Sequence, residues 1–116
     1  MSTVRQYAIT VPAATGDVDT VILNGVTVTA FHVIKTEANG NNNDTVQLYK
    51  VVSGVSQPIS SVVDLAINDQ TTKGPSGISI DDTASLIPAQ GTIRISANNN
   101  LNCACLCFVT GIPNTE

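Results

Sequence analysis

The sequence predicts an all-β fold, a single β-sandwich of about eight antiparallel strands with a jelly-roll-like arrangement. Val, Ile and Thr account for 14, 11 and 14 of the 116 residues, whereas there are only six Leu. β-Branched side chains pack well on a pleated surface, so this composition favours strands over helices. Eleven Asn, eight Gly and five Pro supply the turns between them.

The N-terminal third contains the clearest turn signal in the chain. Residues 4–11 are expected to form a strand that ends at Pro12. After a short loop, two β-rich stretches, 18–23 and 26–37, flank the pair Asn24-Gly25. Because Asn-Gly tolerates the positive φ angles of a type I′ turn, the sequence predicts a β-hairpin at this point.

The remaining strands are separated by polar loops and by a turn that contains Gly54. Further strands are expected at residues 45–52, 59–65, 78–80, 84–87, 92–97 and 101–112. Long connections are expected at residues 38–44 and 66–77. Residues 1–17 are then either an N-terminal arm or the first strand, 18–113 the sandwich, and 114–116 a frayed tail.

Alternation along several strands predicts which side chains face the core. Inward positions are expected at Ile93, Ile95 and Ala97, and Val46 and Leu48 share one face with Lys50. The long stretch 26–37 is apolar on both sides, with Phe31, Val33 and Lys35 on one face and Val28, Ala30, His32 and Ile34 on the other. Such a strand is either central in its sheet or covered by a neighbouring subunit.

Composition excludes several function classes. Charged residues make up 12% of the chain and the net charge is −4, which gives no electrostatic reason to bind nucleic acid or a membrane surface. No apolar run reaches the ~18 residues of a membrane span, and no signal peptide is recognisable, so we expect a soluble protein made in a cytoplasm. With only four aromatic residues, a sandwich of this size is expected to gain buried area by oligomerisation.

Three cysteines alternate in the last strand, at Cys103, Cys105 and Cys107. Side chains two residues apart on a strand point the same way, with Cα atoms roughly 6.6 Å apart, which disfavours a disulfide. The same geometry disfavours a shared tetrahedral zinc, whose Zn–S bonds are about 2.3 Å. We therefore expect small buried side chains in a reduced compartment, with metal or redox chemistry and an intersubunit disulfide as alternatives.

No motif in the sequence points to catalysis. His32 is the single histidine, and no Gly-x-Ser-x-Gly, His-Glu-x-x-His or phosphate-loop pattern accompanies it, so a structural role is expected. Two Asn/Asp-rich spots, residues 41–44 and 81–82, offer oxygen ligands to calcium. Asx-turn chemistry explains both without a metal. The sequence thus predicts no enzyme activity, no metal and no cofactor.

Four short motifs occur in a fixed order in the C-terminal two thirds of the chain. They are Asp44-Thr45-Val46-Gln47-Leu48, the stretch from Ile59 to Val63-Asp64-Leu65, Ile80-Asp81-Asp82-Thr83-Ala84 with Ile87, and Gly91-Thr92-Ile93-Arg94-Ile95. In this order they resemble small β-sandwich structural proteins of tailed bacteriophages, found among head decoration (cement) and capsid-fibre proteins. Thr83 before Ala84 and the cysteine-rich last strand depart from that pattern.

The resemblance implies a jelly-roll-like homotrimer on the outer surface of a phage capsid, bound between subunits of the major capsid protein. Alternatives are a capsid-fibre base, a tail or baseplate adhesin, or a carbohydrate-binding module. The absence of Trp argues against the last, because sugar rings usually stack on exposed aromatic side chains. Candidate subunit or capsid contacts are Tyr7, Ile9, Cys103, Cys105, Leu106, Cys107 and Phe108.

Overall fold

The computed structural model describes residues 4–12, 16–35, 45–64, 72–73, 78–97 and 104–114. These residues form ten β-strands and no helix, which confirms the all-β prediction. In chain order the strands are β1 (Arg5–Val11), β2 (Asp17–Val21), β3 (Val26–Lys35), β4 (Thr45–Val52), β5 (Val55–Pro58), β6 (Val63–Asp64), β7 (Thr72–Lys73), β8 (Leu86–Ile87), β9 (Thr92–Ala97) and β10 (Cys105–Pro113). No helix among the described residues is long and apolar enough to cross a membrane.

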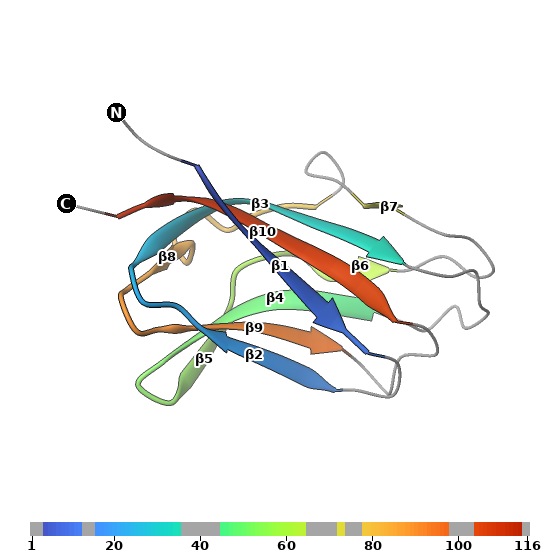
Figure 1. Ribbon diagram of the computed structural model, residues 1–116, viewed down its shortest axis with the longest axis horizontal. Coiled ribbons are helices and arrows are strands. Elements are labelled where there is room, and N and C mark those ends of the chain that lie inside the picture. Colours follow the sequence, from blue (N-terminus) through green and yellow to red (C-terminus); the bar gives the residue numbers. More distant parts are fainter. Residues whose placement is uncertain are drawn as a thin grey trace.

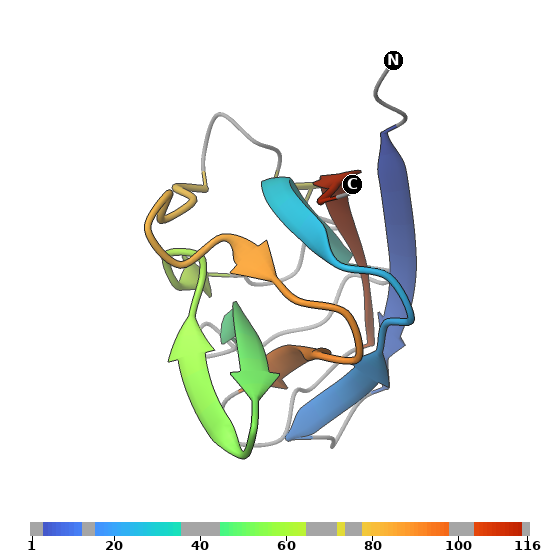
Figure 2. The same cartoon turned by 90° about the vertical axis from the view of Figure 1, so that its left-hand side faces the viewer.

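The strands pair into two antiparallel sheets that pack face to face (Figure 1). Sheet A has the order β1-β10-β3, with β7 and β8 both paired to β3. Sheet B has the order β2-β9-β4, with β5 and β6 both paired to β4. The chain crosses repeatedly from one sheet to the other, and this strand order is that of a jelly roll. Figure 2 shows the two layers from one end, with β1 and β2 on the same side of the sandwich.

The ten strands occupy eight positions, because two edges are each built from two short strands. At the edge of sheet B, β5 pairs with Tyr49–Val52 and β6 with Thr45–Val46 of the same strand. At the edge of sheet A, β7 and β8 pair with opposite ends of β3. β7 falls within the stretch 66–77 that the sequence assigns to a connection. Most of that stretch, like the predicted loops at 38–44 and 98–100, lies outside the described residues.

The core lies between the sheets and follows the predicted alternation. Ile93, Ile95 and Ala97 of β9 are buried, and so are Val46 and Leu48 of β4. The strongest contribution from sheet A is Phe31, whose side chain is fully enclosed. Around it lie mostly β-branched side chains, which matches the composition from which the sandwich was predicted.

A β-bulge in β3 changes the faces that strict alternation predicts. Along β10, Thr110 pairs with Ala30 but Gly111 pairs with Val28, so Thr29 is an extra residue in β3. The inward face of β3 is therefore Val26, Val28, Phe31 and Val33 rather than an unbroken odd or even series. Ala30, His32 and Ile34 remain together on the other face, as predicted, but the placement of Val28 with them is wrong.

The predicted hairpin around Asn24-Gly25 is also wrong, because β2 belongs to sheet B and β3 to sheet A. The link between them passes from one sheet to the other, and neither Asn24 nor Gly25 has a positive φ. The tight hairpin is instead at Ser53-Gly54, between β4 and β5. There both central residues have positive φ, 52° and 79°, as a type I′ turn requires.

Gly25 is required for close packing, and its replacement should therefore be costly. A Cβ at this position would lie 2.7 Å from Asn114 Nδ2, 3.0 Å from the Ile87 carbonyl oxygen and 3.1 Å from Ala89 N. We expect Gly25→Ala to lower the free energy of unfolding by about 1–3 kcal/mol, since backbone must move to make room. The matched control is Gly16→Ala, where a Cβ meets nothing within 4 Å. Urea denaturation of both variants measures the difference; equal midpoints would contradict this account.

Both ends of the chain are tied into the sandwich within the described residues. Arg5–Val11, which the sequence leaves open between an arm and a first strand, forms β1 and pairs along its whole length with β10. Asn114, in the expected tail, donates from Nδ2 to the Ile87 carbonyl oxygen at 3.0 Å and from its backbone N–H to the Gly25 carbonyl oxygen at 3.0 Å. The start of β1 and the end of β10 therefore lie at the end of the sandwich that contains β8 (Figure 1).

Candidate functional site

The outer face of sheet A is a broad surface on which none of the described side chains carries a fixed charge. In this antiparallel sheet, side chains of paired residues lie on the same face. Ala8, Phe108 and His32 form one cross-strand row, and the neighbouring rows are Gln6–Thr110–Ala30 and Thr10–Leu106–Ile34. The three β1 side chains are exposed, and the six on β10 and β3 are half-buried. We refer to these nine residues as the outer face of sheet A.

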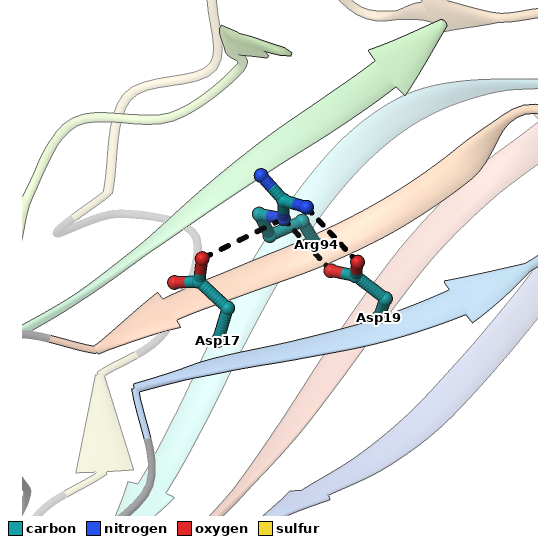
Figure 3. A network of polar contacts seen from close by, with 3 residues as sticks. All are labelled: Asp17, Asp19 and Arg94. Carbon is teal, nitrogen blue, oxygen red and sulfur yellow. Dashed lines mark hydrogen bonds and ion pairs between the residues drawn. The ribbon is translucent and has the colours of Figure 1, made fainter. Parts of the chain in front are cut away.

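The outer face of sheet B is charged. Arg94 of β9 forms a two-pronged contact with Asp19 of β2, in which Nε donates to Oδ1 at 2.8 Å and Nη2 donates to Oδ2 at 3.0 Å (Figure 3). Asp17 approaches the same Nε from the other side at 3.8 Å. The hydrogen bond from Arg94 holds the pKa of Asp19 below its usual value. Because Arg94 and both carboxylates are partly exposed, solvent screens this ion pair and it adds little to stability.

The structure divides the seven predicted contact residues between the core and the surface. Cys105, Cys107 and Ile9 are buried between the sheets, so none of them is available to a partner. Tyr7 is half-buried and packs against the core. Leu106 and Phe108 lie on the outer face of sheet A, and Cys103 lies outside the described residues. Of the two faces of the last strand, the Leu106 and Phe108 face is the one that a second molecule can reach.

Cys105 and Cys107 share one face of β10, as the alternation predicts, and both are buried in the core without a disulfide between them. Their Sγ atoms lie 3.9 Å apart, within the reach of an S–H···S hydrogen bond. This contact with Cys105, together with burial, raises the pKa of the Cys107 thiol well above its usual range. The thiolate is the reactive form of cysteine, so the geometry describes inert core side chains.

We therefore expect alkylation of these thiols only through unfolding. A Cys103→Ser variant, treated with excess iodoacetamide and followed by mass spectrometry, should stay unlabelled at Cys105 and Cys107 under native conditions. Labelling should accelerate with urea in proportion to the unfolded population, because the enclosed thiols become accessible only then. Rapid labelling of folded protein would contradict the burial of these side chains.

His32 lies in the middle of the outer face of sheet A, beside Phe108. The two rings meet edge to face, with centroids 6.3 Å apart and planes inclined by 65°. Nε2 of His32 is inaccessible to solvent and has no hydrogen-bond partner among the described residues.

The acidic turn at residues 81–82 is explained by its own hydrogen bonds. Asp81 Oδ1 accepts from the backbone N–H of Thr83 at 2.9 Å and from Thr83 Oγ1 at 2.7 Å. These bonds hold the pKa of Asp81 below its usual value. No cluster of three or more His, Cys, Asp or Glu suited to a metal occurs among the described residues, and residues 41–44 lie outside them.

Two surface hollows were not predicted from the sequence. One, of about 630 Å³, lies at the end of the sandwich near the termini and is lined by Arg5, Asn24, Gly25, Leu86, Pro88, Ala89, Pro113 and Asn114. A further one, of about 220 Å³, lies on sheet B and is lined by Asp17, Tyr49, Ser56, Arg94 and Ser96. Both combine residues from distant parts of the chain, and only the strand order brings these residues together.

Comparison with known proteins gives a fold and no family. No family model matches the sequence, and no curated protein matches it either. The core of Drosophila NLP, described for its pentamer formation and histone binding, matches with a TM-score of 0.50 and 15% identity over 95% of this chain and 98% of that one. At this identity the likeness concerns the fold alone.

A structure of the infectious bursal disease virus Gx strain matches with a TM-score of 0.36 and 6% identity, over 97% of this chain and 37% of that one. A similarity at that level carries no argument about function. What these comparisons support is therefore the β-sandwich that the strand order already describes.

Proposed function

We propose that this protein is a non-enzymatic structural component of a phage virion, a capsid decoration protein that assembles through the outer face of sheet A. In this proposal a homotrimer binds the exterior of the head between subunits of the major capsid protein and stabilises the shell. The observation that carries the proposal is the uncharged outer face of sheet A on a sandwich whose opposite face is charged. The ordered motifs from Asp44 to Ile95 support the virion setting.

Charge explains why sheet A is the better contact for a second copy. The chain has a net charge of −4, so two copies repel each other unless they meet where charge is absent. Sheet B would bring Asp17 and Asp19 of one copy towards those of another, whereas sheet A presents Leu106, Phe108 and Ile34. Depletion of charge with retention of aromatic and aliphatic side chains is typical of the buried centre of an interface.

A trimer also explains how weak contacts with a capsid become durable. After one subunit binds, the remaining two contacts form at high effective concentration, so the whole complex is held more tightly than any single contact. A shell clamped in this way needs no catalytic group. The charged face of sheet B then remains available to solvent or to the capsid.

The alternatives differ in what the surface must offer. A fibre base or a tail adhesin would use the same assembly face but bind a different virion protein. A carbohydrate-binding module needs an open aromatic platform, and neither Tyr provides one. Tyr7 packs against the core, and Tyr49 is half-buried with its hydroxyl donating to Gln47 Oε1 at 3.2 Å.

Two measurements test the proposal. Native mass spectrometry should find a species of three times 12.0 kDa, and a mass of five times 12.0 kDa would replace the trimer by a pentamer while keeping assembly. Purified protein should then bind phage heads that lack a decoration protein and raise the temperature at which they release DNA. A folded monomer that leaves the heads unchanged would overturn the proposal, and binding to tail or fibre proteins alone would favour the second alternative.

A further inference from the structure

The centre of the outer face of sheet A is occupied by the single histidine of the chain. His32 sits in the central row of this face, between Phe108 of β10 and the edge of the sheet where β7 pairs with β3. Its Nε2 atom is already withdrawn from solvent and lacks a hydrogen-bond partner, although the ring as a whole is only half-buried. A buried polar atom without a hydrogen-bond partner lowers stability. A positive charge on a ring buried in this way would lower it further.

The neighbours of His32 offer nothing that would compensate a positive charge. The side chains that share its face are Gln6, Ala8 and Thr10 of β1, Leu106, Phe108 and Thr110 of β10, and Ala30 and Ile34 of β3, none of which is acidic. The described acidic groups lie elsewhere, at Asp17, Asp19, Asp64, Asp81 and Asp82. Among the described residues, an imidazolium on this face would therefore have no counter-ion.

We propose that His32 makes self-assembly of this protein sensitive to acid: two copies meet on the outer face of sheet A while His32 is neutral, and its protonation separates them. This inference rests on the proposed assembly, and it adds the group that controls it. The occupant of the face is another copy of this chain, because subunits of an acidic protein that meet on an uncharged face keep the carboxylates of sheet B, Asp17 and Asp19, apart.

The direction of the pH dependence of assembly follows from the linkage between proton binding and association. In the assembled state His32 would be covered by an equally uncharged face, so burial disfavours its charged form there more than in the free subunit. The free subunits consequently bind more protons than the assembly, and assembly is lost as the pH falls. With one proton taken up per subunit, the association constant should fall by up to about tenfold per subunit for each pH unit.

The composition allows a pH dependence of assembly to be assigned to one residue. His32 is the single histidine of the chain, and histidine is the side chain whose ordinary titration lies between about pH 5 and 8. The isoelectric point is about 4.6, so acidification from pH 7.0 to 5.5 lowers the net negative charge. General charge repulsion would then favour association at the lower pH, which is opposite to the effect proposed for His32.

The experiment compares sedimentation velocity of the full chain at pH 7.0 and 5.5, with circular dichroism to establish that it remains folded at both. The wild type should be oligomeric at pH 7.0 and should dissociate at pH 5.5. His32→Gln, which keeps a polar side chain but cannot be protonated, should stay oligomeric at both pH values. His32→Lys, which is charged at both, should be a folded monomer at both.

Each contrary result has a distinct meaning. A wild type that is oligomeric at both pH values, or a His32→Gln variant that dissociates as the wild type does, would overturn the role of His32 and leave assembly standing. A wild type that is monomeric at both pH values would overturn the proposed assembly itself. Assembly of His32→Lys at pH 7.0 would show that the face containing His32 is not the contact.

Discussion

Replacing Leu106 with aspartate is expected to convert the assembled protein into folded monomers. Leu106 lies on the outer face of sheet A between Thr10 and Ile34, with no cationic side chain on that face to receive a carboxylate. Burying an unpaired charge in an interface costs several kcal/mol, which corresponds to a loss of affinity of at least about a hundredfold. Native mass spectrometry at micromolar concentration, with urea denaturation of the same sample, measures both the assembly and the fold.

The matched control for this variant is Ser56→Asp. Ser56 lies on the exposed strand β5 at the edge of sheet B, so its replacement with aspartate adds the same charge to the opposite face of the sandwich. It should leave the oligomeric mass unchanged. If Ser56→Asp dissociates the protein and Leu106→Asp does not, the contact lies on sheet B and the assignment of the two faces must be exchanged.

Replacing Phe31 with alanine should destabilise the subunit itself by about 3–5 kcal/mol. Phe31 is 0% exposed and is among the largest fully enclosed side chains of the core. Its removal therefore leaves a cavity between the two sheets, where most other side chains are smaller aliphatic groups. The free energy of unfolding from urea titration gives the effect.

Phe108 provides the comparison, because the second phenylalanine lies on the outer face of sheet A. Phe108→Ala should change the stability of the isolated subunit much less than Phe31→Ala, yet it should weaken assembly. Measured at a protein concentration low enough to keep both variants monomeric, the two should differ by at least about 2 kcal/mol. Equal losses would mean that Phe108 packs within the subunit as tightly as Phe31.

Local alternation was sufficient to predict the core of the regular strands. In β9 and β4 the period of two runs without interruption, so Ile93, Ile95 and Leu48 could be assigned inward from the sequence. The spacing of Cys105 and Cys107 places both on one face of the strand, but the sequence leaves open whether that face is buried in the core or contacts another subunit. These assignments need no knowledge of which strand pairs with which.

Features that depend on pairing could not be predicted in this way. Asn24-Gly25 has the composition of a hairpin turn, but Gly25 is required because Asn114, at the far end of the chain, packs against it. The extra residue Thr29 shifts the face of β3 by one position, and its sequence gives no sign of this. The contact of Arg94 with Asp19 likewise requires β2 and β9 to be neighbours, which only the strand order establishes.

The position of β10 has a consequence for how the chain is made. β10 is synthesised after all the other described strands, yet it lies between β1 and β3 and pairs with both. Until β10 has been made, β1 has no pairing partner. The edges of β1 and β3 that pair with β10 then expose unpaired backbone N–H and C=O groups. Sheet A can therefore form only after β10 has been synthesised, and a nascent chain stalled before residue 105 would be a target for chaperones, proteases and aggregation.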